Sequence, residues 1–457
     1  MTDIKKYLGI LAICGACCSN TTASNLLEGK PDTTTIQGNA SNLSHFITYG
    51  LQNNFQIRIV SNQERIAENN ATKANAGYLP KVNLNGGYTG SFQSNNIHLR
   101  NNDATQKERN QFNQGINAGV FAEWTVFDGF KIQTNYKRLQ ELRKYSATQT
   151  RIAIEDYVAD ITAEYYNFIQ QKIRLRNLLH AVKLSKERLR IVQERYLIGS
   201  GSRLSLQQAQ VDFNADNARS LKQHELLRRS AIRLNEMMAI TEVNQRLSVE
   251  DTVIDVDSNL IMEDLWAATL KTNAQLIKAA QNKTLADLDL ESVKSRDYPY
   301  LKLNADYAYR WNKYEEGATD SRSNWGPGFG VTVGYKLFDG NRKRERRNAK
   351  ISIENAELAQ KHLELSLKAD LADLWQAYRN NLRLLELERE NLVTAKENHF
   401  IAHERYLLGD LSGIEMREAQ QNLLDAEERI LVAEFNTKLC EISLHQISGN
   451  IMKYAEY

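Results

Sequence analysis

The feature that most constrains this chain is an internal duplication with an offset of about 210 residues. The tripeptide Phe-Asp-Gly at 127–129 recurs at 338–340, 211 residues later, and the motif Tyr-x-x-Gly at 196–199 recurs at 406–409, 210 residues later. Three residues further upstream recur with an offset of 219: Asn54, Pro80 and Tyr88 as Asn273, Pro299 and Tyr307. Because the order is kept and the spacing nearly so, we expect the chain to fold as two copies of one structural unit.

Composition narrows the folds that this unit can adopt. The 457 residues include only four prolines, Pro31, Pro80, Pro299 and Pro327, so the segments 81–298 and 328–457 contain none. Since proline breaks helix interiors, these segments can form very long helices. A mean hydropathy of −0.53 excludes a bundle of apolar membrane helices. The net charge of +2 gives no support for a nucleic-acid partner.

The first 23 residues have the pattern of an export signal. Lys5 and Lys6 precede an apolar stretch at 7–18, and Thr21-Thr22-Ala23 offers a cleavage site with small residues. The alternative is an apolar start of a cytoplasmic protein, and a lipid-modified Cys17 or Cys18 is a second possibility. Removal of the signal would leave Cys440 as the one cysteine, so we expect no disulfide framework.

Two segments, 80–127 and 299–338, have the alternation of β-hairpins with one apolar and one polar face. The residues expected on the polar, lumen-facing side include Glu123, Lys302, Asp306, Arg310 and Lys336. Strands of about ten residues with aromatic ends fit a transmembrane β-barrel, and a soluble β-sandwich is the alternative. A barrel must close, and four strands are too few, so several chains must contribute; three chains would supply twelve strands.

A stretch of about 65 residues with helical periodicity follows each Phe-Asp-Gly. Apolar residues recur with a mean spacing of 3.5, which is typical of coiled-coil packing. A glycine-marked turn then sends the chain back as a second helix, so each copy is predicted to contain a helical hairpin. The expected segments are an extension at 24–44, the first copy at 45–240 with its tip at 196–206, a linker at 241–262, the second copy at 263–450 with its tip at 406–416, and a tail at 451–457.

The Phe-Asp-Gly tripeptide is predicted to join a strand to a helix. Phe127 and Phe338 would end the strands as aromatics at the membrane–water boundary. Asp128 and Asp339 would cap the following helices, which Gly129 and Gly340 would let the chain enter.

Together the duplicated Phe-Asp-Gly, the Tyr-x-x-Gly turns and the proline-led strands resemble the TolC family of outer-membrane channel proteins, over nearly all of the mature chain. The resemblance implies a mixed α/β membrane protein: a homotrimer whose twelve strands form one barrel in the outer membrane of a Gram-negative bacterium, with helices extending into the periplasm. It also implies a passive exit duct, without cofactor or metal, of a tripartite efflux pump or a type I secretion system. The partners implied are a periplasmic adaptor and an inner-membrane transporter of the RND, ABC or MFS type.

The resemblance also assigns roles to residues at the two tips. Residues expected to contact the adaptor are Tyr196, Gly199, Arg203 and Gly409. Residues expected at the periplasmic entrance are Tyr406, Asp410, Glu415 and Glu418. Crowded carboxylates favour cations over anions, and Ser205 and Gln208 occupy the corresponding positions of the first copy, so the acidity is confined to the second.

Other candidate chemistry is weak. His399 and His403 have the i, i+4 spacing of a metal pair, but both fall in the heptad pattern. The basic run at 341–350 suits a solvated helix face, anionic lipid head groups or, by composition alone, nucleic acid. No nucleophile motif occurs, so an enzyme is not expected. The rival functions are a trimeric coiled-coil surface protein with a barrel anchor and a soluble coiled-coil scaffold.

Overall fold

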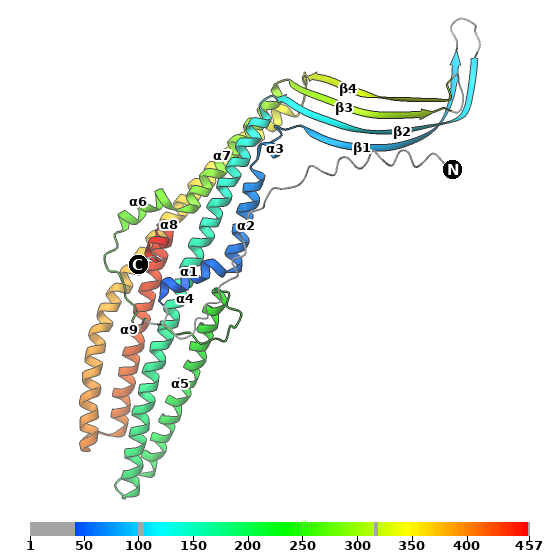
Figure 1. Ribbon diagram of the computed structural model, residues 1–457. Helices are drawn as coiled ribbons and strands as arrows, with labels where there is room; N and C mark the ends of the chain where they lie inside the picture. Colours follow the sequence, from blue (N-terminus) through cyan, green and yellow to red (C-terminus); the bar gives the residue numbers. More distant parts are fainter. Residues whose placement is uncertain (1–41, 99–104, 250, 252, 315–318, 456–457) are drawn as a thin grey trace, which may run out of the picture. The chain divides into compact units, whose positions relative to one another are not determined.

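In the computed structural model, residues 42–98, 105–249, 251, 253–314 and 319–455 are described, and four of their segments form one antiparallel sheet (Figure 1). The sheet order is β1-β2-β3-β4, so the two predicted hairpins join through the pairing of β2 with β3. The strands are β1 (Lys81–His98), β2 (Thr105–Asp128), β3 (Tyr300–Lys313) and β4 (Ser321–Gly334). The signal segment and most of the predicted N-terminal extension lie outside the described residues.

The strand register confirms the predicted faces of the sheet. Val120 lies opposite Leu84 on one side and Tyr307 on the other, and Tyr307 in turn lies opposite Pro327. Cross-strand partners share a face, so the apolar positions of all four strands form one surface. Much of this surface is exposed in the single chain, with Leu84 at 81% and Phe329 at 92%. A continuous apolar surface of this kind marks contact with a membrane or a partner.

The four strands, of 18, 24, 14 and 14 residues, are longer than the ten or so predicted, but β4 ends earlier than predicted. β4 ends at Gly334 rather than at Phe338, because the next residue of the facing strand would be Pro299, which has no N–H to continue the ladder. β2 reaches Asp128 because it pairs with β3 as far as Tyr300. Lys336, predicted as a lumen-facing strand residue, therefore lies beyond the strand, where its Nζ is 3.6 Å from Asp339 Oδ2.

The helical hairpins have matching lengths in the two copies. The long helices α4 (Lys131–Leu197) and α8 (Arg342–Leu408) each have 67 residues. The returning helices α5 (Arg203–Met237) and α9 (Gly413–Ile447) each have 35. In the part of the chain that the structure describes, none of the helices has the combination of length and apolar character that crossing a bilayer requires.

The helix predicted before each hairpin is two helices, broken at a repeated asparagine. Asn54 separates α1 (Leu43–Asn53) from α2 (Phe55–Asn70), and Asn273 separates α6 (Met262–Thr272) from α7 (Ala274–Lys294). Each asparagine caps the second helix through its Oδ1. Its Nδ2 donates to a carbonyl at the end of the returning helix, Met237 in the first copy at 2.8 Å and Ile447 in the second at 2.9 Å. The repeated asparagine therefore ties both ends of each copy together.

The main core lies around the middle of α4. Ile161, Tyr165 and Ile169 are fully buried there, together with residues of α1, the end of α5 and the linker. The predicted tail is not loose, because α10 (Ile451–Ala455) inserts Ile451 into the same core. Two short elements complete the described residues: α3 (Lys73–Ala76) and the 3-10 turn η2 (Ser295–Asp297).

Candidate functional site

The tips of the two helical hairpins end in the same backbone geometry. Gly199 and Gly409 have φ of +81° and +89°, the left-handed region that glycine adopts at low cost. In each turn the N–H of the next residue donates to a carbonyl in the last helical turn, Ser200 to Arg195 at 2.9 Å and Asp410 to Arg405 at 3.0 Å. The repeated glycine is thus the residue that ends the helix.

The returning helices start with a serine cap, and only the second copy adds an acid. Ser412 Oγ accepts from the N–H of Glu415, and the Glu415 carboxylate accepts from the N–H of Ser412 at 3.0 Å. This reciprocal pair satisfies two helix-terminal donors. The hydrogen bonds from Ser412 hold the pKa of Glu415 below its usual value. In the first copy Ser205 occupies the acid's position; its N–H donates to Ser202 Oγ at 3.1 Å and its hydroxyl lies 2.9 Å from the same oxygen.

The predicted entrance acids lie on one exposed side of α9. Glu415 and Glu418 are exposed, whereas the residues that follow each of them, Met416 and Ala419, are buried in a cluster with Tyr406. The packing of α9 on α8 therefore presents both carboxylates away from the hairpin.

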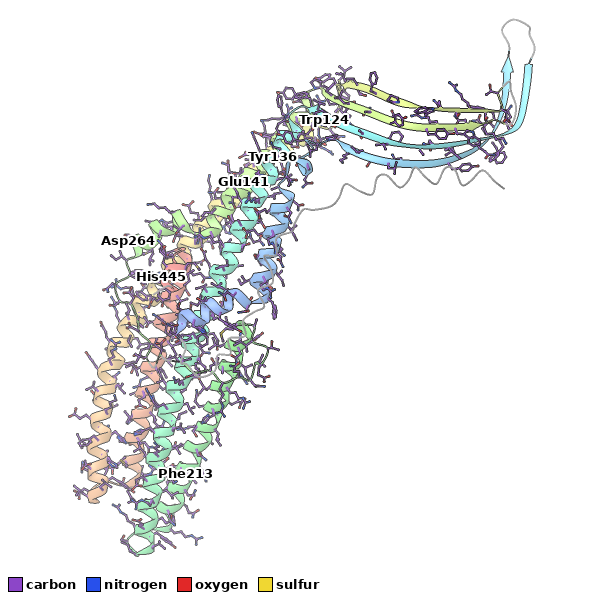
Figure 2. All side chains as sticks on the ribbon, viewed as in Figure 1. Trp124, Tyr136, Glu141, Phe213, Asp264 and His445 are labelled. Carbon is purple, nitrogen blue, oxygen red and sulfur yellow. The ribbon has the colours of Figure 1, made fainter. Side chains whose placement is uncertain are left out.

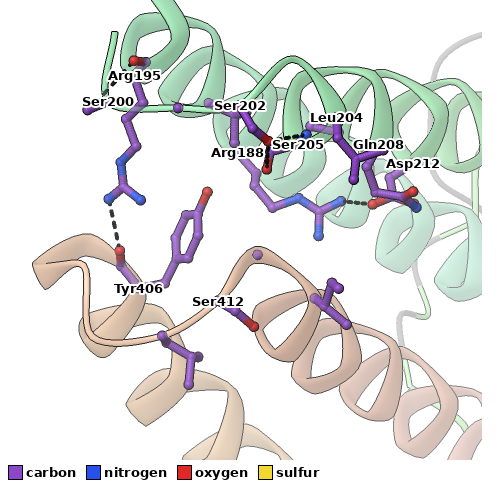
Figure 3. A pocket seen from close by; sticks show the side chains of 16 residues that line it. Arg188, Arg195, Ser200, Ser202, Leu204, Ser205, Gln208, Asp212, Tyr406 and Ser412 are labelled. Carbon is purple, nitrogen blue, oxygen red and sulfur yellow. Dashed lines mark hydrogen bonds and ion pairs between the residues drawn. The ribbon is translucent and has the colours of Figure 1, made fainter. Parts of the chain in front are cut away.

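Tyr406 is one of the links between the two tips. It is 3% exposed, and the Arg195 guanidinium lies 5.1 Å from its ring centroid. Arg195 Nη2 also donates to the Tyr406 carbonyl at 3.1 Å, as Figure 3 shows. Tyr196, the counterpart of Tyr406 in the first copy, is instead 39% exposed, so the two tips are not equivalent.

A cavity of about 500 Å³ lies between the two tips (Figure 3). Its walls come from α4, from the start of α5 and from the second turn with the start of α9. The polar side chains lining it include Arg188, Arg195, Ser202, Ser205, Gln208 and Asp212. Glu415 and Glu418 do not line it, so the predicted entrance acids and this cavity are separate surfaces of the tip.

Two buried ion pairs lie at and beside this cavity, one within the first hairpin and one between the two hairpins. Arg188 of α4 pairs with Asp212 of α5 at 2.5 Å. Arg417 of α9 holds Asp216 of α5 with two hydrogen bonds, of 2.6 and 2.8 Å, and Asp216 is 2% exposed. The Asp216 carboxylate raises the pKa of Arg417, while burial lowers that of Arg188. Removing one member of such a buried pair leaves an uncompensated charge.

These four charged residues were not predicted from the sequence. The heptad pattern placed Val182 and Leu189 at the seam of α4, whereas Ala181, Ser185 and Arg188 are buried there. The buried stripe has moved by one residue because α4 packs against both α5 and α9. The one sequence feature that could have indicated these charged residues was the i, i+4 spacing of Asp212 and Asp216, which places two acids on one face of a helix.

The Phe-Asp-Gly junctions differ between the copies. Asp128 Oδ1 accepts from the N–H of Ile132 at 3.0 Å, so the predicted cap forms, and Gly129 has φ of +71°. Asp339 instead accepts from the N–H of Asn341, which precedes α8, and Gly340 is not left-handed. The prediction that glycine eases entry into the helix is correct only for the first copy.

Aromatic side chains gather where β2 meets α4. The register shifts between Thr125 and Phe127, and this bulge sets Phe127 opposite Leu301 on the apolar face. Trp124 Nε1 donates to the Tyr78 carbonyl at 2.9 Å, and Tyr136 packs edge-on against the Tyr78 ring. Figure 2 labels Trp124 and Tyr136 at this end of the sheet.

Charged residues of the polar face of the sheet form ion pairs with one another. Lys302 Nζ lies 3.1 Å from Glu123 Oε1 across β2 and β3, and Arg310 Nη2 lies 3.1 Å from Asp306 Oδ2 along β3. These four residues share the face opposite the apolar one. His399 and His403 stack with ring centroids 6.3 Å apart, and no group of three or more metal-ligating side chains occurs within the described ranges.

Comparisons with known proteins identify one family and several similar solved structures. A family model described as outer membrane efflux protein matches residues 48–239 and 265–450. A membrane protein from Pseudomonas aeruginosa is similar in structure, with a TM-score of 0.73 and 14% identity, covering 89% of this chain and 93% of its own. The outer membrane protein VceC from Vibrio cholerae has a TM-score of 0.71 and 15% identity, covering 89% and 96%. The CmeC outer membrane channel of Campylobacter jejuni has a TM-score of 0.72 and 14% identity, covering 89% and 85%. No curated protein matches the sequence.

Proposed function

Because this chain belongs to the outer membrane efflux protein family, we propose that it forms the passive exit duct of a tripartite export assembly. The observation that carries the proposal is the direct connection of a sheet with one exposed apolar face to two long helical hairpins. The sheet suits an outer-membrane barrel, and the hairpins suit a tunnel through the periplasm. The surface-protein alternative is disfavoured, because the strands lie inside each copy and return into helices.

The open edges of the sheet support a homotrimer. Among the described residues, β1 pairs only with β2 and β4 only with β3, so these two strands leave unpaired edges. Unpaired strand edges are not tolerated in a bilayer, and four strands cannot close a barrel. Three chains, with β4 of one paired to β1 of the next, would form a closed barrel of twelve strands.

The oligomeric state tests this arrangement. We expect the mature protein to require detergent and to elute as a trimer in size-exclusion chromatography with light scattering. A monomer that stays soluble without detergent would contradict both the barrel and the trimer.

The export role is tested by deleting the gene. Loss of the duct should raise sensitivity to antibiotics, detergents or metal ions if the assembly is an efflux pump, or abolish secretion of particular proteins if it serves type I secretion. Complementation with the wild-type gene is the control. A deletion that changes neither property would contradict the proposed export function.

The tips are the proposed contact surface for a periplasmic adaptor, which in turn would recruit an inner-membrane transporter of the RND, ABC or MFS type. Around the glycine turns, several large apolar side chains are exposed in the single chain: Leu197, Ile198, Leu204, Leu408 and Ile414. Exposed apolar side chains next to Tyr196, Gly199, Arg203 and Gly409 fit a protein partner. The family's members act as passive channels, and we propose no catalytic step for this chain.

The acids at the entrance, Glu415 and Glu418, give a further prediction. Glu415→Gln with Glu418→Gln should weaken block of the channel by trivalent cations about tenfold or more, because six carboxylates per trimer would be removed. Glutamine still serves in a capping box, so the tip should keep its fold. The measurement is the half-blocking cation concentration in planar bilayers, with Glu225→Gln on the exposed side of α5 as control. If the double variant were blocked at the same cation concentration as the wild type, the placement of both acids at the entrance would be wrong.

A further inference from the structure

A second cavity, of about 580 Å³, lies at the start of α8 and is lined almost entirely by cations. Its six lining residues are Asp297, Arg342, Lys343, Arg346, Arg347 and Lys350. Five positive charges and one negative charge thus face one space of the size of a small ligand.

The one acid that lines this cavity already pairs with two of its arginines. Asp297 forms ion pairs with both Arg342, at 3.3 Å, and Arg346. The Nε atoms of these two arginines are buried and have no hydrogen-bond partner among the described residues. Within the same ranges, no ion pair involves Lys343, Arg347 or Lys350. The cavity therefore keeps a large excess of positive charge and unused donors.

The duplication does not account for these cations. At an offset of 211 residues, the first copy has Asn135, Tyr136 and Leu139 in place of Arg346, Arg347 and Lys350. Of the basic residues that the first copy carries nearby, Arg138 pairs with Asp289 and Arg143 with Glu68, whereas Lys131, which aligns with Arg342, and Lys137 are exposed. The first copy therefore does not repeat the set of cations that lines this cavity.

In the chain, the cations that line this cavity come directly after exposed apolar side chains. Leu337 and Phe338, between β4 and α8, are 89% and 88% exposed. Arg342 Nη2 donates to the carbonyl of the preceding Lys336 at 3.0 Å, which holds the start of α8 against this segment. Apolar and aromatic residues followed at once by cations are typical of the boundary between the hydrocarbon of a membrane and its head groups.

We propose that this cavity binds the phosphate group of an anionic phospholipid head group at the periplasmic surface of the outer membrane. Arginine offers donors that match two phosphate oxygens at once, and the lysines add compact positive charge. Leu337 and Phe338 contact the acyl region of the same lipid. The assignment of a lipid rests on the proposed membrane position of the sheet, whereas the affinity for phosphate rests on the cavity alone.

Native mass spectrometry of the detergent-solubilised full mature protein tests the proposal. The variant Arg347→Gln with Lys350→Gln removes two cations but leaves both partners of Asp297. It should retain phosphatidylglycerol about 30-fold less well than the wild type, since each cation near an anionic lipid contributes roughly fivefold. Lys131→Gln with Lys137→Gln removes two exposed cations of the first copy and should change nothing.

Two further measurements distinguish a lipid head group from free phosphate as the ligand. Phosphatidylcholine should bind weakly to all variants, and inorganic phosphate in calorimetry should bind the wild type only at far higher concentration than the lipid. Tight binding of inorganic phosphate without lipid retention would overturn the head-group assignment, and equal lipid retention by all variants would overturn the site. Single-channel conductance should be the same in wild type and variant, so a failure of the channel function itself would be seen separately.

Discussion

Gly129→Ala is expected to destabilise the protein severely, whereas Gly340→Ala, at the duplicated position, is expected to be tolerated. A β-carbon at Gly129 would lie 2.1 Å from the Ser295 carbonyl oxygen and 2.8 Å from Tyr298 Cβ. The residue also has φ of +71°. Left-handed backbone and overpacking together should cost about 2 to 5 kcal/mol of folding free energy.

At Gly340 the nearest atom to an added β-carbon is a ring carbon of Phe338 at 3.8 Å, an ordinary contact, and φ is not positive. The comparison is made by thermal unfolding of the purified protein in detergent and by the fraction that migrates as an intact oligomer on semi-native gels. Equal melting temperatures for the two variants would mean that the junctions are equivalent, contrary to the geometry described above.

Asp216→Asn is expected to loosen the tip and to open the duct without a partner. The substitution keeps the shape of the side chain but removes the charge that faces Arg417, leaving a mostly buried guanidinium without its main counter-charge. Breaking a buried pair in this way costs about 3 kcal/mol. Because this pair ties α9 to α5, the second hairpin should be released from the first, and single-channel conductance should rise several-fold.

The control for Asp216→Asn lies on the same helix. Glu225 pairs with Arg229 at 3.5 Å, and both side chains are exposed, so Glu225→Gln should change stability by less than about 1 kcal/mol. Its conductance in planar bilayers should match that of the wild type. If Asp216→Asn also behaved as the wild type in conductance and in unfolding, the buried pair would not be what holds the tip.

The elements of this fold were predictable because their signals are local. Alternation along residues 115–127 and 301–311 identified the apolar faces of β2 and β3, and the register confirms them. The glycines at 199 and 409 marked the helix ends because a left-handed residue favours glycine wherever it occurs. The break at Asn54 and Asn273 was missed, since an asparagine inside a helical pattern does not by itself show that its amide has a distant partner.

The candidate site was predictable only in part. The entrance acids and the turn residues were found through the family resemblance, and their roles in gating and docking remain predictions. Arg188, Asp212, Asp216 and Arg417 were missed, because each looks like a solvated charge on a helix until its partner is known. The end of β4 at Gly334 was missed for the same kind of reason, since it depends on Pro299 in the facing strand.

The sequence by itself determined the two-copy organisation, the strand faces and the long helices, because periodicity and turn chemistry act over a few neighbouring residues. Only the tertiary structure decided how the copies differ. Arg195 packs on Tyr406 but Arg405 has no such role toward Tyr196, and Gly129 is crowded by Ser295 whereas Gly340 is open. These differences arise from contacts between residues far apart in the chain, and such contacts depend on which surfaces the folded elements bring together.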